Sequence, residues 1–485
     1  MIFRRLLALV ALLLAAACAP AGVPPQTAST TGTQSGSPTP SARPAALPRD
    51  VEKVVGPTYP SAALQAYVDG VGQKLMTDAK LRGSYHFYVL DQPLANAHAL
   101  PSGYVFVTRG LLALLDDEAE LAAAFAHELG HLAQGHATQR ERQRQNAINT
   151  AVEAARVTGS IAVGRSVAHD QLLALRAYSR EQELEADRAG VGYITQAGYR
   201  GDAMTSLIDK LQRQSRLEAL FFDQTPETAV RRSALSTHPA PDERLAALHD
   251  IVAVSGRSAA PPDDAAARAA YFARIDGMSV DDAPEEGFVR GQAFLHPTLK
   301  FAFRVPPGFR LFNDTDGVLA VSRDGAVMYF SCQAAQIPGT LTDWMRDQVK
   351  PTPTDIQSTR IGGAEAAIGA RPRGSDTGLS QVRYVVIRRD AGVCYFNLVS
   401  DGLDRDRRIE TMVAASRSFH SLSDAEAAAL RPYRLRVLPL DGTTPAQLAA
   451  RLPYPDFKMN RLLTLNGVDD AAELARRRLV KTVEP

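Results

Sequence analysis

His127-Glu128-Leu129-Gly130-His131 and, further along the chain, Glu183-Leu184-Glu185-Ala186-Asp187 are the two stretches that decide the fold of this 485-residue protein. The first stretch has the form H-E-x-x-H. Residues four positions apart lie on one face of an α-helix, so His127 and His131 can direct two imidazoles at one point. This arrangement is typical of a zinc site, and Glu128 beside it can reach a water bound to the ion.

The second stretch supplies carboxylates for the same site. A catalytic zinc takes three protein ligands and leaves one position open. We predict that Glu183 completes the set from a second helix and that Asp187 holds the far ring nitrogen of one histidine. These two residues share a helical face, whereas Glu185 points about 200° away from Glu183. We therefore interpret Glu185 as a solvated or ion-paired side chain.

The residues around H-E-x-x-H favour a buried helix. The run from Glu118 to His127 is rich in helix formers. An apolar face that can bury this helix is provided by Leu121, Ala124, Phe125 and Leu132. A bare five-residue match also arises by chance, in which case the histidines are ordinary surface residues. The helical context and the downstream E-x-x-x-D favour the metal site.

Residues 96–248 resemble the zinc metallopeptidases typified by the CAAX prenyl protease and bacterial HtpX, a gluzincin family. The resemblance rests on ordered motifs, which are Asn96-Ala97, Pro101–Val107, Gly110-Leu111-Leu112, the H-E-L-G-H run, Tyr178-Ser179-Arg180, Glu183–Arg188, Ala197-Gly198-Tyr199, Thr237-His238-Pro239 and Arg244-Leu245. It implies one Zn²⁺ per chain, with Glu128 as the general base for peptide hydrolysis. The implied zinc ligands are His127, His131 and Glu183.

The resemblance also implies how substrate binds. In the family an edge strand pairs with an extended peptide through backbone hydrogen bonds. We place that strand at Tyr104–Val107, so that substrate contacts are expected at Gly103, Tyr104, Val105 and Phe106. Because backbone pairing reads little side-chain identity, the expected substrates are unfolded or misfolded polypeptides.

Four further residues lie in or near the motifs. His238 could close the fourth zinc position or stabilise a developing oxyanion, and it could equally belong to a turn before a helix. Arg244 could pair with a carboxylate of the site, with bound peptide, or in a structural ion pair. His136 lies about 140° off the ligand face and is expected to be structural. His98 is expected to be polar surface.

The N-terminus has the form of a targeting segment. Two arginines precede an apolar run, Leu6–Ala17, which is too short to span a bilayer. It ends in Ala15-Ala16-Ala17-Cys18, which resembles a bacterial lipobox. We expect residues 1–18 to be a lipoprotein signal peptide with Cys18 lipidated, and residues 19–48 to be a flexible Pro/Ser/Thr tether. The protein is then periplasmic and anchored to the outer membrane; the alternative is cleavage at an A-x-A site and release.

Composition and length bound the remaining organisation. The chain is long enough for two or three domains, and a net charge of +1 gives no reason to expect a nucleic-acid partner. The fold class expected is α+β, with a mainly helical metallopeptidase domain and a small edge-exposed sheet at residues 49–255. A linker at 256–283, an α+β domain of unknown role at 284–425 and a LysM-like module at 430–485 follow.

The C-terminal half carries two further expectations. Cys332 and Cys394 each lie in an expected strand and could form a disulfide in an oxidising compartment, or remain free thiols. Residues 434–483 resemble a degenerate LysM module, which implies peptidoglycan binding; a small packing subdomain is an equal alternative.

The leading hypothesis from the sequence is a zinc-dependent endopeptidase of the bacterial cell envelope. It would cleave misfolded or stalled periplasmic and outer-membrane proteins. The alternative is a latent protease that acts mainly as a chaperone or assembly factor with the outer-membrane assembly machinery. Zinc-dependent peptidoglycan hydrolysis ranks below both.

Overall fold

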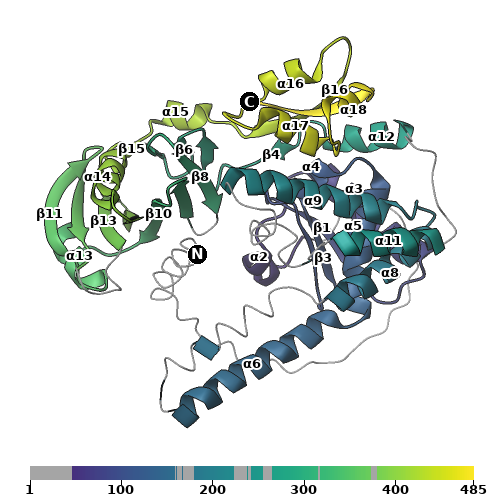
Figure 1. Ribbon diagram of the computed structural model, residues 1–485, viewed down its shortest axis with the longest axis horizontal. Coiled ribbons are helices and arrows are strands. Elements are labelled where there is room, and N and C mark those ends of the chain that lie inside the picture. The colour runs from purple at the N-terminus through teal and green to yellow at the C-terminus, as the bar shows by residue number, and fades with distance from the viewer. Residues whose placement is uncertain are drawn as a thin grey trace. The chain divides into compact units, whose positions relative to one another are not determined.

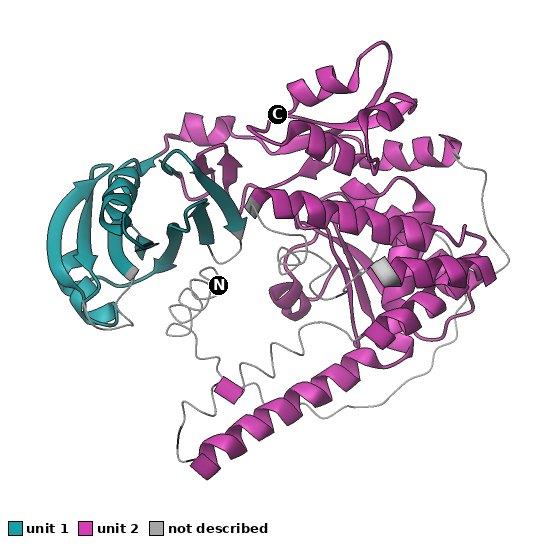
Figure 2. Cartoon of the chain, in the orientation of Figure 1, with its two compact units in different colours: residues 1–43, 302–421 teal, residues 44–301, 422–485 magenta. Residues whose placement is uncertain are grey.

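The computed structural model describes residues 46–158, 160, 166–167, 180–222, 238, 242–254, 265–314, 317–372, 380–390 and 392–485. The described chain forms two compact units (Figure 2). Unit 1 contains residues 302–421, and unit 2 contains the described residues up to 301 together with 422–485. The expected signal peptide, Cys18 and most of the tether lie outside the described residues. No helix in the described part is long and apolar enough to cross a bilayer.

Unit 2 is built on a three-stranded sheet with helices around it (Figure 1). The strand order is β1 (His86–Leu90), β3 (Tyr104–Thr108), β2 (Ala97–Leu100), with β1 parallel and β2 antiparallel to β3. The helices before its C-terminal segment are α2 (Arg49–Val55), α3 (Ala62–Asp78), α4 (Arg109–Leu114), α5 (Glu118–Ala133), α6 (His136–Thr158), α8 (Arg180–Gln196), α9 (Ala203–Phe222), α11 (Asp242–Val254) and α12 (Ala265–Ile275). The α+β class is confirmed for the described chain.

Helix α5 is the centre of the unit 2 core. It begins after Asp117, whose side chain accepts the backbone N–H of Glu120 at 2.9 Å and so caps the first turn. Every residue from Ala119 to His131 is buried. The ring of Phe125 packs on Phe87 of β1 with centroids 4.8 Å apart. An alanine-rich helix buried on all sides carries the H-E-x-x-H stretch into the interior.

The prediction of an edge strand at Tyr104–Val107 is wrong. Strand β3 lies between its two neighbours, and Val105, Phe106 and Val107 are fully buried. Such a continuous apolar run is typical of a strand covered on both faces. Among the described strands, the edge nearest α5 is β2, whose sequence is Ala97-His98-Ala99-Leu100.

The expected linker at 256–283 also differs from the structure in its described part. Helix α12 buries Tyr271 and Phe272, and the Tyr271 hydroxyl donates to the carbonyl of Leu112 at 2.8 Å. After α12, β4 (Ser279–Val280) pairs with β16 (Tyr433–Pro439) of the C-terminal segment. Tyr271, Phe272 and Ile275, at positions i, i+1 and i+4 of one helical face, are the signal that residues 265–275 pack in a core.

The C-terminal segment expected as a separate LysM-like module belongs to unit 2. Its elements are α15 (Asp424–Ala429), β16, α16 (Pro445–Arg451), α17 (Lys458–Leu465), α18 (Ala471–Ala475) and β17 (Leu479–Glu484), and β16 and β17 pair antiparallel. The fully buried Lys481 donates to the carbonyls of Ala113, Leu114 and Leu115 at 2.8–2.9 Å. Its ammonium also lies 3.0 Å from Asp116. These contacts fix the last strand to the end of α4.

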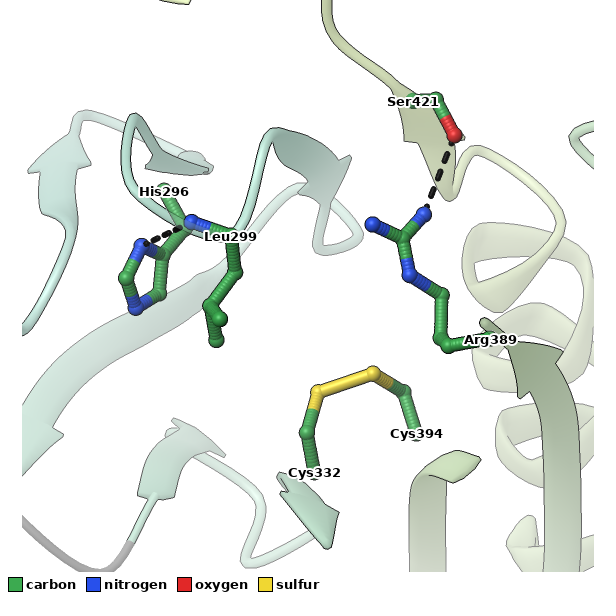
Figure 3. Close-up of a disulfide and its surroundings, with 6 residues drawn as sticks. All are labelled: His296, Leu299, Cys332, Arg389, Cys394 and Ser421. Carbon is green, nitrogen blue, oxygen red and sulfur yellow. Dashed lines mark hydrogen bonds between the residues drawn. A yellow bond between two sulfur atoms is a disulfide. The ribbon is translucent and has the colours of Figure 1, made fainter. Parts of the chain in front are cut away.

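Unit 1 is a seven-stranded antiparallel sheet with two helices. The sheet order is β11 (Thr354–Ile361), β12 (Ala364–Ala370), β13 (Ser380–Arg389), β14 (Gly392–Asp401), β10 (Val327–Ala334), β9 (Gly317–Ser322), β8 (Phe309–Asp314). Its described helices are α13 (Leu341–Gln348) and α14 (Arg405–Ser416). The remaining strands of the described residues are β5 (Phe288–Arg290), β6 (Ala293–His296), β7 (Phe301–Arg304) and β15 (His420–Ser421). Cys332 and Cys394 are opposite each other on β10 and β14 and form a disulfide (Figure 3).

Candidate metal centre

The site is formed where α5 and α8 pack against each other at very short range. A Cβ atom on Gly130 of α5 would lie 2.8 Å from the carbonyl oxygen of Ala186 on α8. A Cβ atom on Gly190 of α8 would lie 3.2 Å from the backbone nitrogen of His127. Small residues on both helices therefore bring the H-E-x-x-H stretch and the acidic stretch into direct contact.

Four buried side chains direct ligand atoms at one point. Among the described residues, His127, His131, Glu183 and His238 each offer one nitrogen or oxygen, and these atoms lie within 4.8 Å of one another. The Nε2 atoms of His127 and His131 are 3.1 Å apart. The Nδ1 atom of His238 lies 3.2 Å from His127 Nε2 and 3.1 Å from Glu183 Oε1. The structure thus brings the three predicted ligands together with His238, for which a fourth-ligand role was one of the alternatives.

The outer nitrogen of His127 is held by Asp187. Its Nδ1 lies 3.0 Å from Asp187 Oδ1, which is the contact expected from the sequence. Arg244 of α11 donates to both oxygens of that carboxylate, from Nε at 2.7 Å and from Nη2 at 2.8 Å. Its Nη1 lies 2.6 Å from Glu183 Oε2. Arg244 thus forms ion pairs with the two carboxylates of α8 that face α5.

His131 has a different outer partner, which sequence reasoning missed. Its Nδ1 lies 2.9 Å from Nδ1 of His136, and His136 Nε2 lies 3.0 Å from Glu185 Oε2. Helix α5 ends at Ala133, and Gly135 has a φ of +68°, so the chain turns and α6 begins at His136. One continuous helix would place His136 about 140° off the ligand face, but the break at Gln134-Gly135 brings it next to His131.

The residue expected to be the general base, Glu128, faces the same cluster. It is buried, and its Oε1 lies 3.6 Å from His238 Nε2. Burial raises the pKa of Glu128, and the nearby Glu183 carboxylate raises it further. His238, His127 and a hydrogen bond from the backbone of Ala99 on β2 oppose this rise without cancelling it. A base whose pKa lies above the ordinary carboxyl value is suited to take and return a proton near neutral pH.

The charge states of Glu183 and His131 suit metal ligation. Burial alone would raise the pKa of Glu183, but His238, His131 and Arg244 hold it well below its usual range. Burial lowers the pKa of His131 to about 3, so its imidazole is neutral. An ionised carboxylate and a neutral imidazole are the forms in which these side chains bind a cation. Burial lowers the pKa of His127, but the Asp187 and Glu183 carboxylates outweigh burial and raise that pKa, so a cation would have to displace a proton from this ring.

The donor set fits zinc. Three imidazole nitrogens and one carboxylate oxygen are the ligand types and the number that Zn²⁺ prefers in proteins. The outer nitrogens of His127 and His131 are both engaged by neighbouring groups, which leaves their Nε2 atoms for the cluster. A shared ion would also relieve the close approach of several ring lone pairs within one buried space.

The residues expected to bind substrate lie in β3 and in the turn before it, so they are not at the edge of the sheet. Gly103 has a φ of +92° and forms the turn between β2 and β3, and Tyr104 and Phe106 are in the central strand. Antiparallel pairing uses the backbone of alternate residues, and Asn96 accepts from Thr108 of β3. The backbone of Ala97 and Ala99 is therefore directed at the outer edge of β2, consistent with the Ala99–Glu128 hydrogen bond.

His98 is part of this edge rather than plain polar surface. Its ring stacks on Phe106 with centroids 5.0 Å apart. Burial, with a smaller electrostatic contribution from His238, lowers the pKa of His98 to about 4. His98 is therefore neutral and close to the site.

Comparison with known proteins agrees with this geometry. Residues 62–252 match the model of Peptidase family M48. The M48 match contains every residue of the candidate metal centre. The chain is 30% identical over 196 residues to the Beta-barrel assembly-enhancing protease of Escherichia coli O157:H7, covering 38% of each protein. It is 28% identical over 143 residues to Metalloprotease LoiP of Escherichia coli (strain K12), covering 28% of this chain and 55% of LoiP.

The M48 match leaves much of the chain unaccounted for. The alignment spans well under half of the first relative. Among solved structures, cyanobacterial PsbP (CyanoP) from Synechocystis sp. PCC 6803 aligns with a TM-score of 0.23 and 14% identity, over 28% of this chain and 94% of that one. That likeness is too weak to support a conclusion.

Proposed function

We propose that this protein is a zinc-dependent endopeptidase of the bacterial cell envelope. The observation that carries the proposal is the convergence of four buried donor atoms within 4.8 Å, with the Glu128 carboxylate beside them. The M48 match and the relatives named as proteases support the same reaction class.

The roles of the chain's own residues follow from their contacts. His127, His131 and Glu183 would hold the zinc ion, with Asp187 fixing the ring of His127. When bound, zinc supplies Lewis-acid chemistry and lowers the pKa of a water. Glu128 removes the proton from the attacking water and delivers it to the leaving amine.

His238 is proposed to occupy the fourth ligand position in a resting state. Its Nδ1 approaches both His127 and Glu183. A histidine that served only in a turn before a helix would not need to be buried among the donor atoms, as His238 is. Arg244 also lies 3.5 Å, through Nη1, from the backbone carbonyl of His238. Catalysis would require His238 to leave this position, after which it could stabilise the oxyanion.

The substrate is proposed to be an extended, unfolded polypeptide that pairs with β2. The outward backbone of Ala97 and Ala99 offers hydrogen bonds without side-chain selection. A pairing peptide would compete for the Ala99 amide that now contacts Glu128 and so place its carbonyl beside the base.

The cellular setting is inferred from the N-terminus and the relatives. The lipobox-like sequence before Cys18 favours a lipoprotein on the outer membrane. A relative named for β-barrel assembly supports misfolded or stalled outer-membrane proteins as substrates and the assembly machinery as a partner. Peptidoglycan binding by residues 430–485 remains part of the proposal, and sedimentation of the full chain with purified sacculi tests it.

One variant pair tests the enzymatic proposal. Glu128→Gln keeps the size of the side chain but removes the base, so it should bind zinc normally and cleave unfolded casein at less than about 1% of the wild-type rate. His238→Ala should cleave faster than wild type if His238 closes the site. Undiminished cleavage by Glu128→Gln would refute the assignment.

The second candidate function is a latent protease that acts as a chaperone or assembly factor. The four-donor arrangement favours it, because a zinc with four protein ligands has no position for water. Rescue of an envelope defect by Glu128→Gln as complete as that by wild type would support this function over proteolysis.

A further inference from the structure

His131 meets helix α8 directly at Glu183, and it is also connected to α8 through a second series of contacts outside the four donors. His131 Nδ1 meets His136 Nδ1 at 2.9 Å, and His136 Nε2 meets Glu185 Oε2 at 3.0 Å. The two histidines are 2% and 1% exposed, whereas the Glu185 side chain is 53% exposed. This second series of contacts therefore runs from the solvent-facing side of α8 to the buried cluster.

The chemistry of these groups fixes the direction of each hydrogen bond. A carboxylate can only accept, so His136 donates to Glu185 from Nε2. A neutral His136 then has a lone pair on Nδ1, and two ring nitrogens at hydrogen-bond distance need one donor and one acceptor. The proton between the two rings is therefore on Nδ1 of His131, and the lone pair of His131 is on Nε2.

Nε2 is the atom that His131 contributes to the cluster, 3.1 Å from His127 Nε2 and 3.4 Å from Glu183 Oε1. The alternating acids of α8 thus have three different positions. Glu183 lies in the cluster, Asp187 contacts the outer nitrogen of His127, and Glu185 reaches the outer nitrogen of His131 through His136.

We propose that His136 and Glu185 are positioning residues that fix the tautomer and orientation of His131 for metal binding. The proposal rests on the proposed function only in taking His131 as a metal ligand. An exposed ion pair of Glu185 would contribute little to stability, whereas a fixed tautomer affects the metal affinity directly.

The test measures zinc affinity of the full chain by competition with a chromophoric chelator, without substrate. Glu185→Ala and His136→Leu should each weaken zinc binding by about tenfold or more. Glu181→Ala is the matched control, because Glu181 is an exposed glutamate one turn earlier on α8. It should leave zinc affinity unchanged.

A rescue variant separates positioning from simple packing. In His136→Asn the side-chain amide oxygen can accept the proton of His131 Nδ1 without help from a carboxylate. His136→Asn should therefore bind zinc more tightly than His136→Leu, and adding Glu185→Ala to His136→Asn should cause no further loss. A merely structural role would give equal affinities for the Asn and Leu variants.

The outcomes distinguish this proposal from the enzymatic one. A zinc affinity of Glu185→Ala within twofold of wild type, or no rescue by His136→Asn, would overturn the positioning role of His136 and Glu185 even if the enzyme is active. Tenfold losses of zinc affinity with rescue would establish that role even if wild type cleaves no peptide. A wild-type chain that takes up no zinc would overturn both.

Discussion

Replacement of Gly130 by alanine tests the contact on which the site depends. A Cβ atom there would lie 2.8 Å from the carbonyl oxygen and 3.1 Å from the Cα atom of Ala186. Both atoms are backbone, so no side chain can rotate away. For the new methyl to reach the 3.4 Å of an ordinary contact, α5 and α8 would have to separate by about 0.6 Å.

The magnitude follows from two opposing effects. Overpacking a close contact costs about 1–3 kcal/mol. Replacing a helical glycine by alanine returns about 1 kcal/mol of helix propensity. Gly192, exposed on α8 with nothing within 4 Å of its Cβ position, supplies the matched control. Gly192→Ala should gain that propensity alone, so the two variants should differ by about 1–3 kcal/mol, the overpacking cost itself.

Thermal melting of the two variants measures this difference. A change of 1 kcal/mol shifts the melting temperature by about 2–4 °C for a domain of this size. Gly130→Ala should melt below Gly192→Ala by about 2–4 °C for each 1 kcal/mol of overpacking cost. It should also bind zinc more weakly, because a helix separation beyond about 0.5 Å exceeds what a preorganised site tolerates. If Gly130→Ala melts as high as Gly192→Ala and binds zinc normally, the close packing of α5 on α8 is refuted.

Three other changes give measurable outcomes. Asp187→Asn should weaken zinc binding by about 10–100-fold in chelator competition, because the orientation of the His127 ring depends on that carboxylate; an unchanged affinity would contradict the role. Lys481→Met should destabilise unit 2 by about 3 kcal/mol in denaturant unfolding, because the buried carbonyls of Ala113, Leu114 and Leu115 lose their hydrogen-bond donor. An unchanged free energy of unfolding would argue against a fixed C-terminal strand. Replacing Cys332 and Cys394 together by alanine should lower the free energy of unfolding by about 4 kcal/mol on the chain-entropy account for a separation of 62 residues. A wild-type melting temperature that does not change with reductant would contradict this prediction.

The helical half of the site could be predicted because its signals are local. The H-E-x-x-H spacing fixes which residues share a face, and the acidic stretch repeats that spacing at Glu183 and Asp187. Capping residues also set helix starts, as Ser61 does by accepting the Leu64 N–H before α3. These features depend on neighbours within one turn and so can be read from the chain itself.

What could not be predicted depends on tertiary contact. The place of Tyr104–Val107 in the sheet is set by which strands pair, and its unbroken apolar run indicated a central strand that family analogy placed at the edge. The His136 contact required a chain reversal at Gly135. The embedding of Lys481 required a partner more than 360 residues away in the sequence.

The central claim is that His127, His131 and Glu183 jointly hold one zinc ion beside Glu128. Elemental analysis of purified protein after dialysis tests it most directly, with Glu183→Ala beside Glu128→Gln. We predict one zinc per chain in wild type and in Glu128→Gln, and a large loss of zinc in Glu183→Ala. Equal zinc in Glu183→Ala and wild type, or a wild type that holds none, would contradict the claim.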